Sequence, residues 1–163
     1  MNQIVQTKSY ETKKGEELLH EKIRILKDKA RKIIEDIAHA RSFGDLSENA
    51  EYHEAKKLQN KYSAELEQLT QYIKNLHVVE SHECDENSVS IGATVHILDC
   101  DTEKKKVYKI VGFYEANVDE GLIFYNSPLG KVLFGKKLND EFEFKPNPNK
   151  DFFYKIINIA YDK

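Results

Sequence analysis

The sequence predicts an α+β protein: an antiparallel helical hairpin that forms a coiled coil, followed by a small antiparallel sheet domain with one short helix. Two observations indicate this fold class. Apolar residues repeat at heptad spacing as far as residue 76, and short β-branched and aromatic runs separated by turn residues follow from residue 93. We therefore expect a hairpin over residues 1–78, a linker over 79–90 and the sheet domain over 91–163.

Two apolar stripes define the hairpin, each with alternating spacings of three and four residues. The first comprises Leu19, Ile23, Leu26, Ala30, Ile33, Ile37 and Ala40. The second comprises Tyr52, Ala55, Gln59, Tyr62, Leu66, Leu69, Ile73 and Leu76. Neither segment contains Pro or an internal Gly, and Gly44 falls where the first helix should stop. Because the connection is short, the stripes are buried most simply by folding back on each other as a rod of roughly 40 Å.

The second half reads as strands bounded by turn residues. The runs lie within residues 93–98, 105–114, 121–126, 140–144 and 151–161. Between the third and fourth runs, Ser127 is suited to cap a helix and Pro128 to occupy its first position. This pattern predicts one short helix among the strands.

Composition limits the possible functions. The chain has no apolar run long enough for a membrane span and no secretory signal at its start, so we expect a cytoplasmic protein without membrane contact. Cys84 and Cys100 are expected as thiols, because with His82 they match no zinc spacing and they form no disulfide framework. The net charge of −3 does not mark the whole chain as a nucleic-acid binder.

Acidic residues concentrate between the two helices. Asp45, Glu48, Glu51 and Glu54 fall within ten positions. One interpretation is structural: Asp45 caps the second helix and Glu48 completes a capping box. The surplus of acids favours a second interpretation, in which Asp45 and Glu48 at the end of the rod bind Mg²⁺ or Mn²⁺, which prefer carboxylate oxygens. Two exposed carboxylates are too few for a tight site, so the remaining ligands would come from another molecule.

The stretch "ARSFGDLSENAEYHEAKKLQ" closely resembles the tip signature of the bacterial Gre transcript-cleavage factors, nearer the GreA branch than GreB. The resemblance extends to "ETKKGEELLHEKIRIL" at the start of the hairpin. It also covers "VSIGATVHILD", "YKIVGFYEA" and "NSPLGKVLFGKKLND" in the second half. It therefore spans the chain from about Thr12 to the end, with an FKBP-like second domain implied.

The resemblance implies a specific activity. Gre factors bind bacterial RNA polymerase, insert the hairpin through its secondary channel and stimulate the polymerase to hydrolyse backtracked RNA. By motif position, Asp45 and Glu48 are the acids that help hold a second Mg²⁺ shared with the polymerase. Glu51 and Tyr52 match the signature without a settled role, and Tyr52 also fits the apolar stripe. The chain would have no active site of its own and would act as a monomer.

Two further groups have both a functional and a structural interpretation. Basic side chains near the tip could contact phosphates of displaced RNA or form a solvated face paired with Glu51 or Glu54; they are Arg41, His53, Lys56, Lys57 and Lys61. Ser127 and Pro128 are explained by helix capping, and in the Gre family the matching loop contributes to polymerase docking.

Two other functions compete with transcript cleavage. A polymerase inhibitor with the same fold would bind the channel and block it, although such relatives differ at the tip, where Asp45 and Glu48 stand here in an intact motif. A peptidyl-prolyl isomerase with a helical appendage is suggested only by the FKBP-like fold, and a fold does not carry its activity with it.

Overall fold

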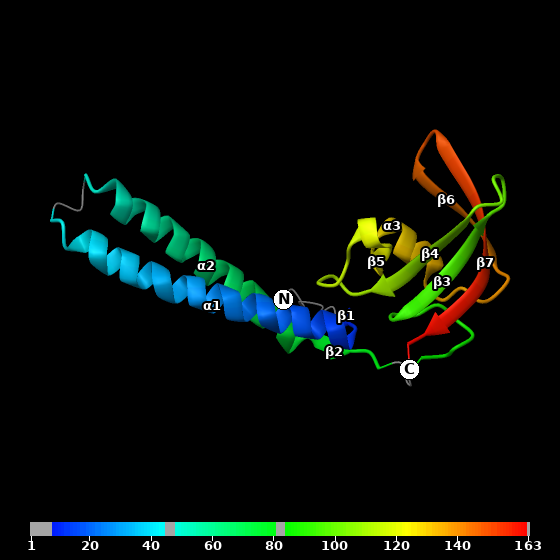
Figure 1. Cartoon of the computed structure of the whole chain (residues 1–163), viewed down its shortest axis with the longest axis horizontal. Helices are drawn as coiled ribbons and strands as arrows, with labels where there is room; N and C mark the ends of the chain where they lie inside the picture. The colour runs from blue at the N-terminus through cyan, green and yellow to red at the C-terminus, as the bar shows by residue number, and fades with distance from the viewer. Residues whose placement is uncertain (1–7, 45–47, 81–83, 163) are drawn as a thin grey trace, which may run out of the picture. The chain divides into compact units, whose positions relative to one another are not determined.

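The computed structural model describes residues 8–44, 48–80 and 84–162. These residues form two compact units (Figure 1). The hairpin unit comprises Leu18–Asn75, and the sheet unit comprises residues 8–17 together with 76–162. Within the described ranges, no helix is long and apolar enough to cross a membrane.

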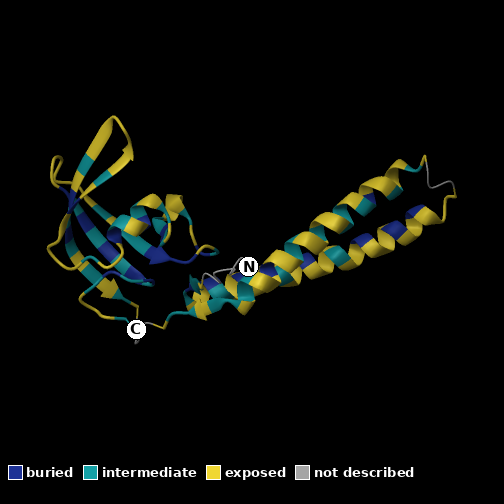
Figure 2. Cartoon of the chain, turned by 180° about the vertical axis from the view of Figure 1, so that it is seen from behind, coloured by how far each residue is buried: buried dark blue, intermediate teal, exposed yellow. Residues whose placement is uncertain are grey.

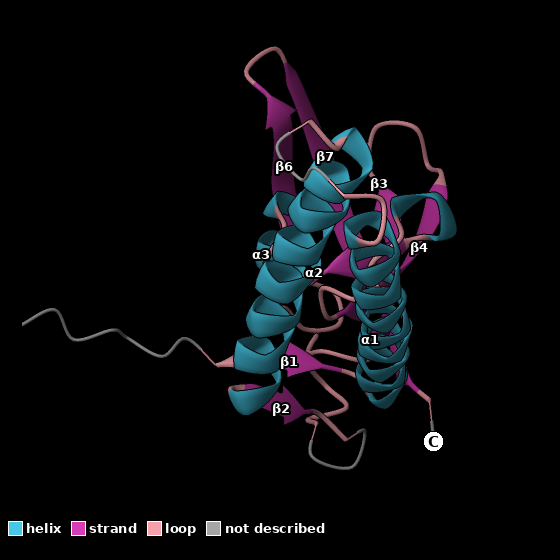
Figure 3. Cartoon of the chain, turned by 90° about the vertical axis from the view of Figure 1, so that its left-hand side faces the viewer, coloured by secondary structure: helices cyan, strands magenta, loops and turns pink. Residues whose placement is uncertain are grey.

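The hairpin unit consists of two long helices that run side by side (Figures 1 and 3). Helix α1 spans Lys13–Arg41 and helix α2 spans Ala50–Lys74. Every residue of the two heptad stripes is buried or half-buried, whereas most of the intervening positions are exposed (Figure 2). At 1.5 Å per residue, α1 is ~43 Å long. The predicted hairpin and the burial of its two apolar stripes are confirmed.

The sheet unit contains a five-stranded sheet with the order β5-β4-β3-β7-β6. Its strands are β3 (Ala93–Asp99), β4 (Lys105–Val111), β5 (Leu122–Phe124), β6 (Glu141–Asn147) and β7 (Lys150–Tyr161). Each lies at a predicted run. Three neighbouring pairs are antiparallel, but β4 and β5 pair in parallel, so the sheet is mixed rather than wholly antiparallel as we expected. The connection between β4 and β5 contains a short 3₁₀ helix, η2 (Val118–Glu120), rather than a tight hairpin turn.

The predicted short helix is α3 (Pro128–Leu133). Ser127 caps it by accepting a hydrogen bond from the Gly130 N–H at 3.1 Å, and Pro128 occupies the first turn. Leu133 is fully buried against the sheet in a core that includes Val95, Ile97 and Ile156. The helix thereby covers part of one face of the sheet.

A second, two-stranded sheet joins distant parts of the sequence. Strand β1 (Ser9–Glu11) pairs in parallel with β2 (Leu76–Val78), which follows α2. Both strands belong to the sheet unit. The sequence pattern did not predict this pair, because three-residue strands show no periodicity of their own.

Candidate functional site at the hairpin tip

The tip connects the end of α1 to the start of α2. Helix α1 ends at Arg41, and its last carbonyls accept turn hydrogen bonds from the N–H groups of Ser42, Phe43 and Gly44. Gly44 has φ +96°, a left-handed conformation that favours glycine. Asp45 lies outside the described residues, and Glu48 is exposed immediately before α2.

Asn49 organises this connection. Its Oδ1 accepts a hydrogen bond from the Tyr52 N–H at 3.0 Å and caps α2. Its Nδ2 donates to the Ala40 carbonyl at 2.8 Å, which satisfies one of the last carbonyls of α1. A single side chain therefore ties the two helices together at the tip.

This arrangement corrects the expectation that Asp45 caps the second helix and Glu48 completes a capping box. Because α2 begins at Ala50, Glu48 precedes the cap and does not lie within the first helical turn. The error arose because Asp and Asn are equally good caps, so residue type alone could not choose between Asp45 and Asn49. The capping function is thus assigned to Asn49, and Glu48 is exposed to solvent.

Tyr52 and Glu51 occupy different environments. Tyr52 is half-buried and packs against the small apolar cluster of Ile33, Ile37 and Ala55, as its place in the stripe predicts. Glu51 is exposed in the first turn of α2, where a negative charge suits the helix dipole. It also borders a hollow of about 510 Å³ near the tip, whose remaining lining is Ile33, Asp36, His39, Ala50, Glu54, Ala55 and Leu58. Among the described residues, no cluster of three or more acidic, His or Cys side chains could hold a metal ion.

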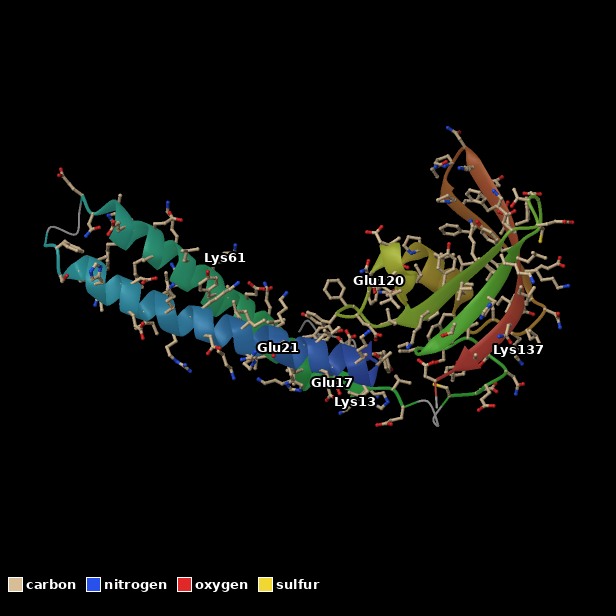
Figure 4. All side chains as sticks on the ribbon, in the orientation of Figure 1. Lys13, Glu17, Glu21, Lys61, Glu120 and Lys137 are labelled. Carbon is tan, nitrogen blue, oxygen red and sulfur yellow. The ribbon has the colours of Figure 1, made fainter. Side chains whose placement is uncertain are left out.

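The basic residues near the tip differ in their contacts and exposure. The Arg41 guanidinium lies 5.7 Å from the centre of the Tyr52 ring. Lys56 donates to Gln59 at 2.8 Å, and Lys57 lies 3.9 Å from Glu54, at the outer limit of an ion pair. His53 and Lys61 are exposed on α2, with Lys61 near its midpoint (Figure 4).

The docking candidates belong to the sheet unit. Pro128 is exposed, and Ser127 is half-buried because it caps α3. Both border an apolar pocket of about 330 Å³ that is otherwise lined by Ala116, Val118, Leu122, Ile123, Phe124, Leu129, Phe144 and Pro146. Val118 at its edge is 78% exposed. An apolar surface of this kind is suited to a protein partner.

The structure also explains Thr12 and Gly15, which form a Thr-x-x-Gly motif at the start of α1. The Thr12 hydroxyl accepts the Gly15 N–H at 3.1 Å and donates to the buried carboxylate of Glu115. Gly15 leaves room for the fully buried Glu11, since a Cβ there would lie 2.3 Å from the Glu11 Oε2. Glu11 in turn accepts the Tyr114 N–H at 3.1 Å. Glu11 and Glu115 could not be predicted as buried from the sequence, because nothing in their local pattern distinguishes them from surface acids.

Two family models match the chain. The model described as "Transcription elongation factor, N-terminal" matches residues 9–78, and the one described as "Transcription elongation factor, GreA/GreB, C-term" matches residues 84–161. The class of protein is therefore a transcription elongation factor. The chain belongs to the GreA/GreB family.

Relatives that match nearly the full length of the chain support the same family. The chain is 42% identical to transcription elongation factor GreA of Nautilia profundicola, with 93% of each chain covered. It is 39% identical to GreA of Thermodesulfovibrio yellowstonii, with 93% of this chain and 96% of the relative covered. Among solved structures, GreA factor homolog 1 of Thermus thermophilus is similar with a TM-score of 0.43 and 20% identity, covering 94% of this chain and 99% of that one.

Proposed function

We propose that this chain binds bacterial RNA polymerase, enters its secondary channel with the hairpin tip and stimulates the hydrolysis of backtracked RNA. Membership of the GreA/GreB family supports this function. The main supporting observation is that different side chains cap α2 and face solvent at the tip. Asn49 caps α2 and leaves Glu48 exposed, so this acid is available to a ligand instead of being used by the fold.

Asp45 and Glu48 are the carboxylates proposed to act at the polymerase active site. Their hard oxygens suit Mg²⁺, but two carboxylates cannot replace the hydration shell of this ion. They would therefore hold a magnesium ion only together with ligands from the polymerase. When bound there, the ion would activate a water molecule and stabilise the leaving oxygen of the RNA.

The neighbouring basic side chains would position the RNA. Arg41 and His53 are exposed near the tip, and the exposed Lys57 lies 3.9 Å from Glu54, at the outer limit of an ion pair. Such cations contact phosphates independently of sequence and lose affinity as salt increases. Lys56 lies between His53 and Lys57 on α2, whereas Lys61 lies further from the tip and would contact RNA farther from its displaced end.

The sheet unit would provide the docking surface. Its apolar pocket beside Ser127 and Pro128 offers exposed hydrophobic area that the fold does not cover. Docking there would raise the effective concentration of the tip at the polymerase active site. This arrangement would separate binding from chemistry within one chain.

The test adds the purified chain and Mg²⁺ to a stalled, backtracked elongation complex. We expect shortened RNA to appear in proportion to the amount of the chain that is added. Inhibited elongation without cleavage would indicate the channel-blocking alternative and overturn the proposal. A proline-peptide isomerase assay on the same preparation should show no acceleration of cis–trans isomerisation, because a fold does not carry its activity with it.

Calorimetry with the free protein tests the shared metal site separately. We expect only weak Mg²⁺ binding, because the tip offers too few ligands. Tight, stoichiometric binding would contradict the sharing of this site with the polymerase.

A further inference from the structure

One aromatic side chain at the tip is exposed to solvent. Phe43 is 66% exposed, and only Val118 is more exposed among the large hydrophobic side chains that the structure describes. It lies two residues after the end of α1, two positions before Asp45 and five before Glu48. In the same unit, the apolar stripes are buried between the helices, so packing does not account for Phe43.

The Phe43 ring is held in place by its neighbours. Its centre lies 4.8 Å from that of the His39 ring, and the two planes meet at 82°. Its N–H donates to the Ala40 carbonyl at 3.3 Å, next to the contact from Asn49 to the same carbonyl. Whichever ring presents its edge, His39 covers at most one face of the Phe43 ring, which agrees with the 66% exposure of this residue.

We infer that Phe43 is a stacking platform for a nucleobase of the displaced RNA, and that the open face of its ring receives the base. This inference rests on the proposed function, which brings backtracked RNA to the tip. Aromatic side chains stack on bases of any sequence, because every base has a π-face. An uncharged ring suits a base better than a phosphate, while the nearby Arg41 provides the positive charge that suits the backbone.

Stacking here would complement the tip acids. Asp45 and Glu48 repel RNA phosphates until a cation is present, whereas a contact between ring and base does not depend on charge. A base held on Phe43 would fix the RNA end a few residues from the carboxylates. Phe43 is thus a substrate-positioning residue that touches the RNA and takes no part in proton or metal chemistry.

The experiment compares variants on two RNAs. Backtracked complexes are assembled with either a normal or an abasic nucleotide at the displaced 3′ end, and cleavage rates are measured at subsaturating factor. Phe43→Ala should slow cleavage of the normal RNA by about 5- to 160-fold, the equivalent of the ~1–3 kcal/mol that stacking on one base contributes. Phe43→Tyr should retain most of the rate, because it keeps the ring.

The abasic RNA separates stacking from other roles. On this RNA the wild-type chain should be slowed to the level of Phe43→Ala, and the substitution should cause no further loss. Ile34→Ala is the matched control, since Ile34 is 57% exposed on α1 but has no ring. It should cleave both RNAs like the wild type.

Three results would overturn the inference. Equal losses for Phe43→Ala on both RNAs would indicate that the ring contacts the polymerase or supports the fold. A Phe43→Ala variant that competes less well than the wild-type chain for binding to polymerase would indicate the same. Unchanged cleavage by Phe43→Ala would show that the ring contacts nothing. If the wild-type chain stimulates cleavage while the variants match it, only the stacking fails; if the wild type itself is inactive, the proposed function fails with it.

Discussion

The same chemical group has opposite roles in the two units. In the sheet unit the carboxylates of Glu11, Asp99 and Glu115 are buried and accept hydrogen bonds from the backbone or from a hydroxyl. At the tip of the hairpin unit, Glu48 and Glu51 are exposed. Burying a charge is costly unless it is hydrogen-bonded, so the buried acids are committed to the fold. The exposed acids remain available for a ligand.

Removal of a buried carboxylate should cause the largest loss of unfolding free energy. Glu11→Ala removes the acceptor of the Tyr114 N–H and leaves a cavity between Gly15 and Gly112. We expect the sheet unit to lose about 3 kcal/mol of unfolding free energy. The matched tip variant, Glu54→Ala, should change it by less than about 0.5 kcal/mol. Urea denaturation measures the unfolding free energy of both variants. Equal losses for Glu11→Ala and Glu54→Ala would refute the contrast between buried and exposed acids.

A second comparison uses glycines. A Cβ at Gly130 would lie 2.2 Å from the Phe124 carbonyl oxygen, a backbone atom that cannot rotate away. Gly130→Ala should therefore cost about 2–3 kcal/mol. At Gly44 nothing lies within 4 Å, so Gly44→Ala should cost only about 1 kcal/mol of left-handed strain. Thermal unfolding should rank the two variants in this order; the reverse order would contradict the close packing of α3.

Asn49 tests what holds the tip. Asn49→Ala removes the cap of α2 and the contact to the Ala40 carbonyl, and should destabilise the hairpin by about 1–2 kcal/mol. Asn49→Asp keeps a capping oxygen but loses the amide donor, so its effect should be smaller. Hydrogen exchange should show the loss of protection in α1 and α2 near the tip. Unchanged protection would indicate that the cap is dispensable.

The smallest effect is a pH dependence of the sheet unit. Burial opposes ionisation of Asp99, but hydrogen bonds from Thr102 and the Asp101 N–H outweigh it and lower the pKa of Asp99 below its ordinary value. A lowered pKa adds stability above the unfolded value near ~3.9, and this stability is lost as the pH falls through the folded pKa. Asp99→Asn should flatten the acid limb of a stability–pH curve. If the stability of Asp99→Asn falls as steeply at acid pH as that of the wild type, Asp99 does not contribute to this pH dependence.

How far the sequence predicted the structure depends on the range of the interactions. The heptad stripes and the Ser127 cap were predictable because their signals lie within a few residues of each other. The β1–β2 pair and the burial of Glu11 were not, because their partners are distant in sequence and leave no local pattern. At the tip, the cap was assigned to Asp45 instead of Asn49 because both residue types cap equally well, and the metal-binding role of Asp45 and Glu48 stays a prediction.

The central claim is that the tip acids act on a ligand and not on the fold. The most direct test is transcript cleavage with the double variant Asp45→Asn and Glu48→Gln at saturating concentration, together with its affinity for polymerase and its melting temperature. Both substitutions keep the side-chain shape and remove the anionic oxygens that a hard cation requires. We expect the double variant to have a wild-type melting temperature and a wild-type affinity for polymerase, but no stimulation of cleavage. A double variant that retains most of the stimulation would contradict it.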